Sequence, residues 1–245
     1  MKKSYIIIGV VVVVMLAAIG IYAVINSNSQ SKKQLEENST NIEGTTNTEN
    51  STKENNTENK DENIQNNQIS NESEENNMYS TGKHHAEIVV KNYGTIALEL
   101  DADVAPITVE NFANLVNEGF YNGLTFHRII SGFMIQGGDP LGNGTGGSSK
   151  TIKGEFASNG VKNSISHVRG TISMARSSMP NSASSQFFIV HQDSTFLDGK
   201  YAAFGTVTSG MEVVDKICAD TAVEGDNGTV AKNNQPVIEK ITMID

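Results

Sequence analysis

The most informative stretch of this chain reads Phe126-His127-Arg128-Ile129-Ile130-Ser131-Gly132-Phe133-Met134-Ile135-Gln136-Gly137-Gly138-Asp139. One arginine, Arg128, stands in a run that consists mostly of aromatic, aliphatic and glycine residues, and Phe133, Met134 and Gln136 follow it closely. This pattern predicts a permanent positive charge beside an apolar pocket. Such a site suits a substrate whose reacting group is a polar amide on an apolar ring, as in an Xaa-Pro peptide bond.

Composition divides the 245-residue chain into three parts. Residues 1–25 are almost entirely apolar after Lys2 and Lys3, and residues 26–83 are dominated by Asn, Ser, Thr, Gln, Glu and Lys. Only residues 84–245 mix apolar, charged and glycine residues as a globular domain does. That length, roughly 160 residues, is enough for one compact core.

The apolar segment predicts a membrane anchor. Residues 5–25 carry no charge, and about 20 helical residues cross the hydrocarbon core of a bilayer. Because Lys2 and Lys3 precede the run, the positive-inside tendency places the N-terminus in the cytoplasm. The expected location is therefore the cell membrane, with a single pass and the folded domain on the extracytoplasmic side. A cleaved signal segment, which would give a secreted protein, stays open as the alternative.

The polar tract at residues 26–83 predicts a disordered linker. It lacks the apolar area needed to offset the entropy of ordering. For about 55 residues, coil statistics give an end-to-end distance of roughly 40 Å. The folded domain is thus expected to stay near the membrane face without being fixed to it.

Charge and residue spacing exclude several kinds of partner. The net charge of -10 divides into +2 at the head, -6 over residues 26–83 and -6 over residues 84–245, so no concentrated basic face invites a nucleic acid. Cys218 is the only cysteine, which excludes an internal disulfide and a cysteine-based metal site. The histidines lack a ligand spacing, and the glycine-rich run at residues 142–147 precedes no amphipathic helix. We therefore expect neither a metal nor a cofactor.

Apolar spacing in residues 84–245 predicts two helices among many short strands. After Ala105-Pro106, apolar residues recur at i, i+3, i+4 and i+7 from Val109, which is typical of a helix. Met211, Val214 and Ile217 share one face of a second helix. Runs rich in β-forming residues predict strands at 87–91, 95–100, 124–130, 133–136, 170–175, 186–191, 201–207 and 236–243. The pattern favours a mainly β, barrel-like α+β domain.

Several blocks of residues resemble the cyclophilin family of peptidyl-prolyl cis-trans isomerases. They are residues 126–139, Gly170-Thr171-Ile172-Ser173-Met174-Ala175, Ser185-Gln186-Phe187-Phe188-Ile189, Phe196-Leu197-Asp198-Gly199-Lys200 and Phe204-Gly205. The run Met174-Ala175-Arg176-Ser177 is similar to that of bacterial members. The resemblance covers nearly all of residues 86–245 and implies a closed eight-stranded antiparallel β-barrel capped by two helices.

The same resemblance implies the site and the activity. Arg128 is implied as the catalytic residue, and Gln136 as the residue that steadies it. The implied substrate-binding residues are Phe133, Met134, Ala175, Arg176, Gln186, Phe188, Phe196, Leu197, Tyr201 and Gly144. We expect an isomerase that accelerates Xaa-Pro rotation in exported proteins as they fold. A non-catalytic module or holdase chaperone that only grips proline-containing polypeptides stays open.

Three positions depart from the best-known eukaryotic pattern of the family. Tyr201 stands where histidine is common, Phe196 where tryptophan is common and Arg176 where asparagine is common. The first implies that turnover needs no imidazole at that position. The second predicts weak cyclosporin binding, because the indole and its N–H donor are absent. The third is expected to alter peptide preference.

Overall fold

The structure is a computed structural model, and it describes residues 78–245 of the chain. The predicted anchor at residues 1–25 and nearly all of the predicted linker lie outside these residues. Over residues 78–245, every helix is too short or too polar to cross a membrane.

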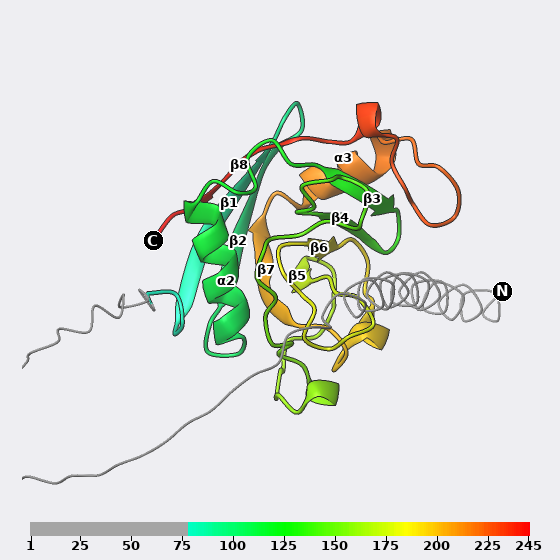
Figure 1. Cartoon of the computed structure of the whole chain (residues 1–245). Coiled ribbons are helices and arrows are strands. Elements are labelled where there is room, and N and C mark those ends of the chain that lie inside the picture. The colour runs from blue at the N-terminus through cyan, green and yellow to red at the C-terminus, as the bar shows by residue number, and fades with distance from the viewer. Residues whose placement is uncertain (1–77) are drawn as a thin grey trace, which may run out of the picture. The chain divides into compact units, whose positions relative to one another are not determined.

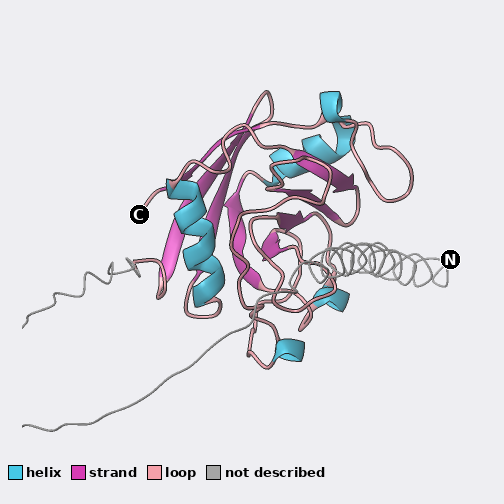
Figure 2. Ribbon diagram, in the orientation of Figure 1, coloured by secondary structure: helices cyan, strands magenta, loops and turns pink. Residues whose placement is uncertain are grey.

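Eight strands and two α-helices form the described domain (Figure 1; Figure 2). The strands are β1 (Lys83–Val90), β2 (Gly94–Asp101), β3 (Phe126–Ile130), β4 (Met134–Gly137), β5 (Thr171–Met174), β6 (Phe187–Val190), β7 (Ala203–Ser209) and β8 (Ile238–Met243). The helices are α2 (Pro106–Asn117) and α3 (Met211–Asp220), and short 3-10 turns lie at Ala157–Asn159, Thr195–Leu197 and Lys232–Asn234. Every strand and helix predicted from the sequence overlaps one of these elements.

All eight strands belong to one antiparallel sheet in the order β3-β4-β6-β5-β7-β2-β1-β8. The fully closed barrel implied by the resemblance is not formed, because β3 and β8 share no ladder in residues 78–245. A short seam joins them instead: the isolated bridge between Thr125 and Val237, with Phe126 N donating to Pro236 O at 2.9 Å. Pro236 has no N–H to donate, which limits how far this pairing can extend.

One face of the sheet carries the core. Ile129, Ile135, Ile189 and Ile172 stand opposite one another on four neighbouring strands, and all are at most 1% exposed. Phe112 of α2 joins them, since its ring lies 5.7 Å from that of Phe187 and 5.3 Å from that of Phe204. Figure 1 shows α2 beside β1, β2 and β8, with α3 on another side of the strands. The helices therefore pack against the part of the sheet that contains β2 and β8.

The folded domain begins earlier than the sequence boundary at His84 suggests. Tyr79 is buried in the core, and Asn117 Nδ2 donates to its hydroxyl at 3.2 Å. Gly82 N donates to the Asp103 carboxylate, and β1 already begins at Lys83. The residues around Tyr79 are mostly polar, so composition alone did not show that this one aromatic side chain packs into the core. Residues 78–83, which the sequence analysis assigned to the linker, therefore belong to the folded domain.

Candidate active site

Strand register places the predicted catalytic residues in one row. Arg128 on β3 stands opposite Gln136 on β4, Gln136 opposite Phe188 on β6, and Phe188 opposite Ser173 on β5. Successive side chains along a strand point to opposite faces. Because the neighbouring row of isoleucines fills the core, the row of Arg128 lies on the other face of the sheet.

A β-bulge lies directly before Arg128. The register between β3 and β4 shifts between Phe126 and Arg128, so His127 has no partner on β4. Bulges re-aim the side chains beside them. On the other edge of β3, Thr229 bridges to Arg128 and brings the carbonyl of Asn227 to its side chain. The guanidinium is therefore approached by groups from both sides of its strand.

The Arg128 guanidinium is only partly satisfied. Its Nε donates to Asn227 O at 2.9 Å, and its Nη1 donates to Gln136 Oε1 at 3.2 Å and lies 4.0 Å from Met134 Sδ. Its Nη2 is buried and has no hydrogen-bond partner among residues 78–245. Burial lowers the pKa of Arg128 below its ordinary value, but arginine stays protonated in proteins. One donor of a charged group is thus left without a partner in this part of the chain.

An apolar cluster separate from the main core lies beside this donor. It consists of Met134, Phe188, Val190 and Leu197, with Ile130, Phe133, Ala175 and Tyr201 packed against it. The ring of Phe188 meets that of Tyr201 edge-on at 5.9 Å, and the ring of Phe133 lies 5.6 Å from that of the exposed Phe196. The structure therefore brings together the residues expected to form a proline pocket: Phe133, Met134, Phe188 and Leu197.

A hydrogen-bond relay connects Arg128 to the rim loop, residues 141–147. Gln136 accepts from Arg128 through Oε1 and donates from Nε2 to Gln186 Oε1 at 2.9 Å. Gln186 Nε2 then donates to the carbonyls of Gly146 at 2.7 Å and Gly144 at 3.2 Å. Because a guanidinium can only donate, the relay sets the orientation of both amides. Gln136 and Gln186 thus hold Arg128 and the loop in a fixed relation.

Asp139 secures the base of the rim loop. Its buried carboxylate accepts from the backbone N–H groups of Leu141 at 2.8 Å, Asn143 at 3.0 Å and Gly144 at 2.6 Å. Burial pushes the pKa of Asp139 up, but the N–H groups of the loop outweigh it and hold the pKa below its ordinary value. A Cβ at Gly146 would collide with the same carboxylate, which explains the glycine there.

Residues 84–243 match the sequence profile of a family described as "Cyclophilin type peptidyl-prolyl cis-trans isomerase/CLD". The chain belongs to the cyclophilin family. It is accordingly a peptidyl-prolyl cis-trans isomerase by class, which confirms the activity predicted from the sequence. The match spans the strands and the loop that carry Arg128 and its neighbours.

Similar proteins agree with this cyclophilin assignment. A peptidyl-prolyl cis-trans isomerase of Helicobacter pylori is 49% identical over 135 residues, which are 54% of this chain and 80% of that protein. Peptidyl-prolyl cis-trans isomerase B of Bacillus subtilis is 50% identical over 117 residues, which are 48% of this chain and 78% of that protein. A crystal structure of a Cryptosporidium parvum cyclophilin, in the presence of the dipeptide Ala-Pro, matches with a TM-score of 0.58 at 31% identity. The match covers 66% of this chain and 99% of that chain.

The side chain of Arg176 makes its contacts within the chain. Its guanidinium stacks between the rings of Phe156 and Tyr201, with Cζ 4.8 Å from each centroid. Its Nε and Nη2 donate to Lys200 O at 3.0 and 2.8 Å, and its Nη1 donates to Ser177 O at 2.9 Å. Each nitrogen is thus engaged within the chain. The Arg176 side chain therefore packs against Tyr201 and holds the carbonyl of Lys200. Contact of Ala175, Arg176 and Gln186 with a peptide stays a prediction.

Sequence reasoning missed several groups at this site. Asn227 contributes a backbone oxygen, and a backbone contact cannot be predicted from the residue type. Asp139 is the last residue of the stretch 126–139, but the sequence alone did not indicate what it does. His167 lies buried beside Phe188, with its ring 6.0 Å away and nearly parallel. Its partner, Asp198, directly follows Leu197 in one of the motif blocks. This adjacency was the only feature of the sequence that could have pointed to the pair.

Proposed function

We propose that Arg128 catalyses rotation about Xaa-Pro bonds by stabilising the twisted imide. The supporting observation is the buried Nη2 donor, which has no partner within residues 78–245, beside an apolar cluster. Such a cluster would hold the proline ring while the acyl side turns. The relative from Cryptosporidium parvum, studied with Ala-Pro, supports proline-containing peptides as the ligand class. Unfolded or folding polypeptides are the expected substrates.

The chemistry requires no covalent intermediate. Amide resonance resists rotation with a barrier of about 18–20 kcal/mol. In the twisted transition state the proline nitrogen regains its lone pair, so a guanidinium directed at that nitrogen or at the carbonyl oxygen binds more strongly as resonance is lost. This is differential binding of the transition state.

The required rate enhancement divides between the arginine and the pocket. Shortening an uncatalysed time of about 10–100 s to milliseconds requires a factor near 10⁴ to 10⁵, or roughly 6 kcal/mol. One preorganised donor supplies about 3–4 kcal/mol in a site without water. The cluster around Met134 and Phe188 must contribute the rest by excluding water and orienting the ring.

Replacement of Arg128 tests this proposal. With the full chain and an Ala-Pro peptide, we expect Arg128→Ala to lower kcat/KM by about 10²- to 10³-fold. Arg128→Lys should recover only part of the loss, because an ammonium lacks the planar fork. Arg169→Ala, which removes an exposed arginine paired with Asp215, is the matched control and should leave the rate unchanged.

The same comparison separates an isomerase from a module that only binds. A pure binder would show equal, negligible rates for the wild type and Arg128→Ala while both suppress aggregation of an unfolded protein. Near-normal turnover in a folded Arg128→Ala variant would remove Arg128 from the mechanism.

We further propose that the protein acts at the outer face of the cell membrane on exported clients. The support is the uncharged run at residues 5–25, preceded by Lys2 and Lys3. Protease treatment of intact cells should digest the domain if it faces outward, and the protein should sediment with membranes. Recovery in the cytosol would contradict the location, and recovery in the medium would favour the cleaved segment.

A further inference from the structure

A buried histidine lies directly behind the proline pocket. His167 is 0% exposed, and its ring stacks on Phe188 at 6.0 Å with 17° between the planes. Phe188 belongs to the pocket cluster and also contacts Tyr201, edge-on at 5.9 Å. The position of the Phe188 ring therefore depends on the position of the imidazole.

Both nitrogens of this imidazole have partners. Nδ1 lies 2.9 Å from Asp198 Oδ1, and Nε2 lies 3.0 Å from Ser173 Oγ. A carboxylate only accepts, so Nδ1 carries the proton and Nε2 accepts from the Ser173 hydroxyl. Burial lowers the pKa of His167 below its ordinary value although Asp198 acts in the opposite direction, so the ring is neutral at neutral pH. The tautomer is thus fixed by the fold.

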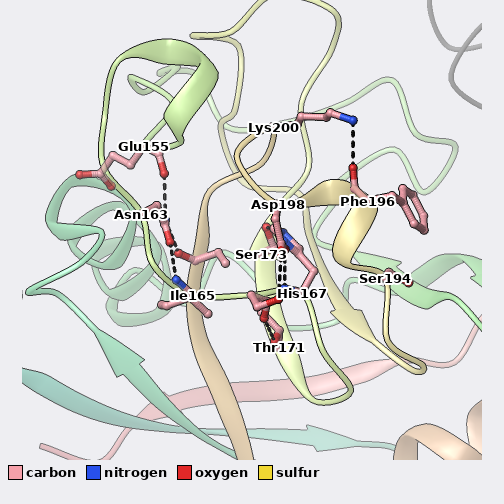
Figure 3. A network of polar contacts seen from close by, with 12 residues as sticks. Glu155, Asn163, Ile165, His167, Thr171, Ser173, Ser194, Phe196, Asp198 and Lys200 are labelled. Atoms are coloured by element: carbon pink, nitrogen blue, oxygen red, sulfur yellow. Dashed lines mark hydrogen bonds and ion pairs between the residues drawn. The ribbon is translucent and has the colours of Figure 1, made fainter.

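Asp198 carries this constraint to the pocket turn, residues 194–200. Its Oδ1 also accepts from His167 N at 2.7 Å, and its Oδ2 accepts from Ser166 Oγ at 2.7 Å. In return, Ser194 N donates to His167 O at 2.7 Å. Figure 3 shows His167, Asp198 and Ser173 together, with the Phe196 side chain pointing away from them. Leu197, a pocket residue, is held between these two attachment points.

A direct role in binding the peptide does not fit these contacts. The His167 side chain is 1% exposed and its two nitrogens are engaged, so it offers nothing to a ligand. The Asp198 side chain is 39% exposed, but its oxygens face Ser166 and His167. What the pair does determine is where Phe188 and Leu197 stand relative to Met134 and Arg128.

We propose that His167 and Asp198 are positioning residues that set the geometry of the proline pocket without touching substrate. This inference rests on the proposed function, since it assigns a cause to the shape of the same pocket. A rigid pocket reduces the entropy lost on binding and aligns the ring with the arginine. Loosening the pair should therefore weaken both peptide affinity and kcat/KM.

A second pair in the same domain provides a matched control. His85 N and Nδ1 contact the Asp245 carboxylate at 2.7 and 2.6 Å, which repeats the pattern of His167 with Asp198. This pair is exposed and joins the start of β1 to the end of the chain. Asp245→Ala removes the corresponding contacts with a histidine N and Nδ1, but away from the pocket.

The experiment compares these variants in the full chain. For each variant, kcat/KM is measured on an Ala-Pro peptide, and peptide affinity is measured by titration followed by NMR. All measurements are made at a temperature well below the Tm of every variant. We expect Asp198→Ala to weaken both by about tenfold, because a buried N–H loses its acceptor. Asp198→Asn should stay within about threefold of wild type, since an amide oxygen can still accept from His167. Asp245→Ala should match wild type.

Each outcome decides between positioning and plain stabilisation. If Asp198→Ala lowers Tm but keeps wild-type kcat/KM and affinity, the inference is wrong. If that variant does not fold, the nitrogen chemical shifts of His167 in the wild type decide: protonated Nδ1 with bare Nε2 supports the inference, and the opposite tautomer contradicts it. Failure of the proposed function is distinguishable, because it would appear as wild-type activity that Arg128→Ala does not reduce.

Discussion

At the scale of single residues, the role proposed for Arg128 depends on which of its nitrogens its neighbours leave without a partner. Asn227 O and Gln136 Oε1 occupy Nε and Nη1, so Nη2 is the one guanidinium nitrogen left without a partner in residues 78–245. The cation and its apolar neighbours could be predicted from one stretch of sequence because their spacing is local. The contact with the Asn227 carbonyl could not be predicted, because this group belongs to the backbone of a loop about a hundred positions away.

Gln136 should matter more than Gln186 for the arginine. Gln136→Ala removes an acceptor from a charged donor, a change of about 1.5 kcal/mol, so we expect about a tenfold lower kcat/KM. Gln186→Ala leaves that acceptor in place and should cost less. Kinetics of the two variants on one Ala-Pro peptide check the order. A larger effect of Gln186→Ala would indicate that Gln186 binds the peptide directly.

Phe196 should limit cyclosporin binding. Its ring is 52% exposed and lies against Phe133, but a phenyl ring offers no N–H donor. We propose that cyclosporin binds weakly and that Phe196→Trp strengthens binding by about tenfold, equivalent to roughly 1.4 kcal/mol. Calorimetric titration measures this, with Ile244→Trp as a control for an exposed indole elsewhere. Equal affinity in the wild type and Phe196→Trp would contradict the proposal.

At the scale of elements, the strands could be predicted more fully than the turns between them. Alternating apolar residues and the residues that open and close α2 are local signals, and they located the strands and both helices. The bulge before Arg128 and the stacking of Arg176 between Phe156 and Tyr201 depend on tertiary contacts. For this reason the sequence did not predict that the Arg176 side chain supports the pocket turn. Contact of Arg176 with a peptide stays a prediction.

The rim loop should weaken in acid. The pKa of Asp139 is lowered in the fold, so its contribution to stability is complete above the ordinary aspartate value of about 3.9 and is lost as pH falls through the folded value. Asp139→Asn should lose about 2 kcal/mol of stability at neutral pH. Thermal unfolding against pH should show the two proteins converging below about pH 4. A constant difference down to pH 2 would contradict this role of Asp139.

At the scale of the whole molecule, the sheet is continuous except at the seam between β3 and β8. The resemblance implied closure, but Pro236 restricts the pairing there in a way that strand patterns do not reveal. Ile238 N donates across the seam to Leu124 O at 2.8 Å, as Phe126 N does to Pro236 O. We expect these two amides to exchange hydrogen at least about tenfold faster than amides in β5 and β6. Native-state exchange followed by NMR measures this. Equal protection would mean that the seam is as stable as the central ladders.

The most direct test of the central claim is to measure catalysis and binding separately in Arg128→Ala. Two-dimensional NMR exchange gives the rate of cis-trans conversion of a bound Ala-Pro peptide, and titration in the same sample gives its affinity. If Arg128 favours the twisted imide over the planar isomers, on-enzyme conversion should slow by about 10²- to 10³-fold while affinity changes by less than about threefold. Equal losses in rate and affinity, or an unchanged rate, would contradict the account.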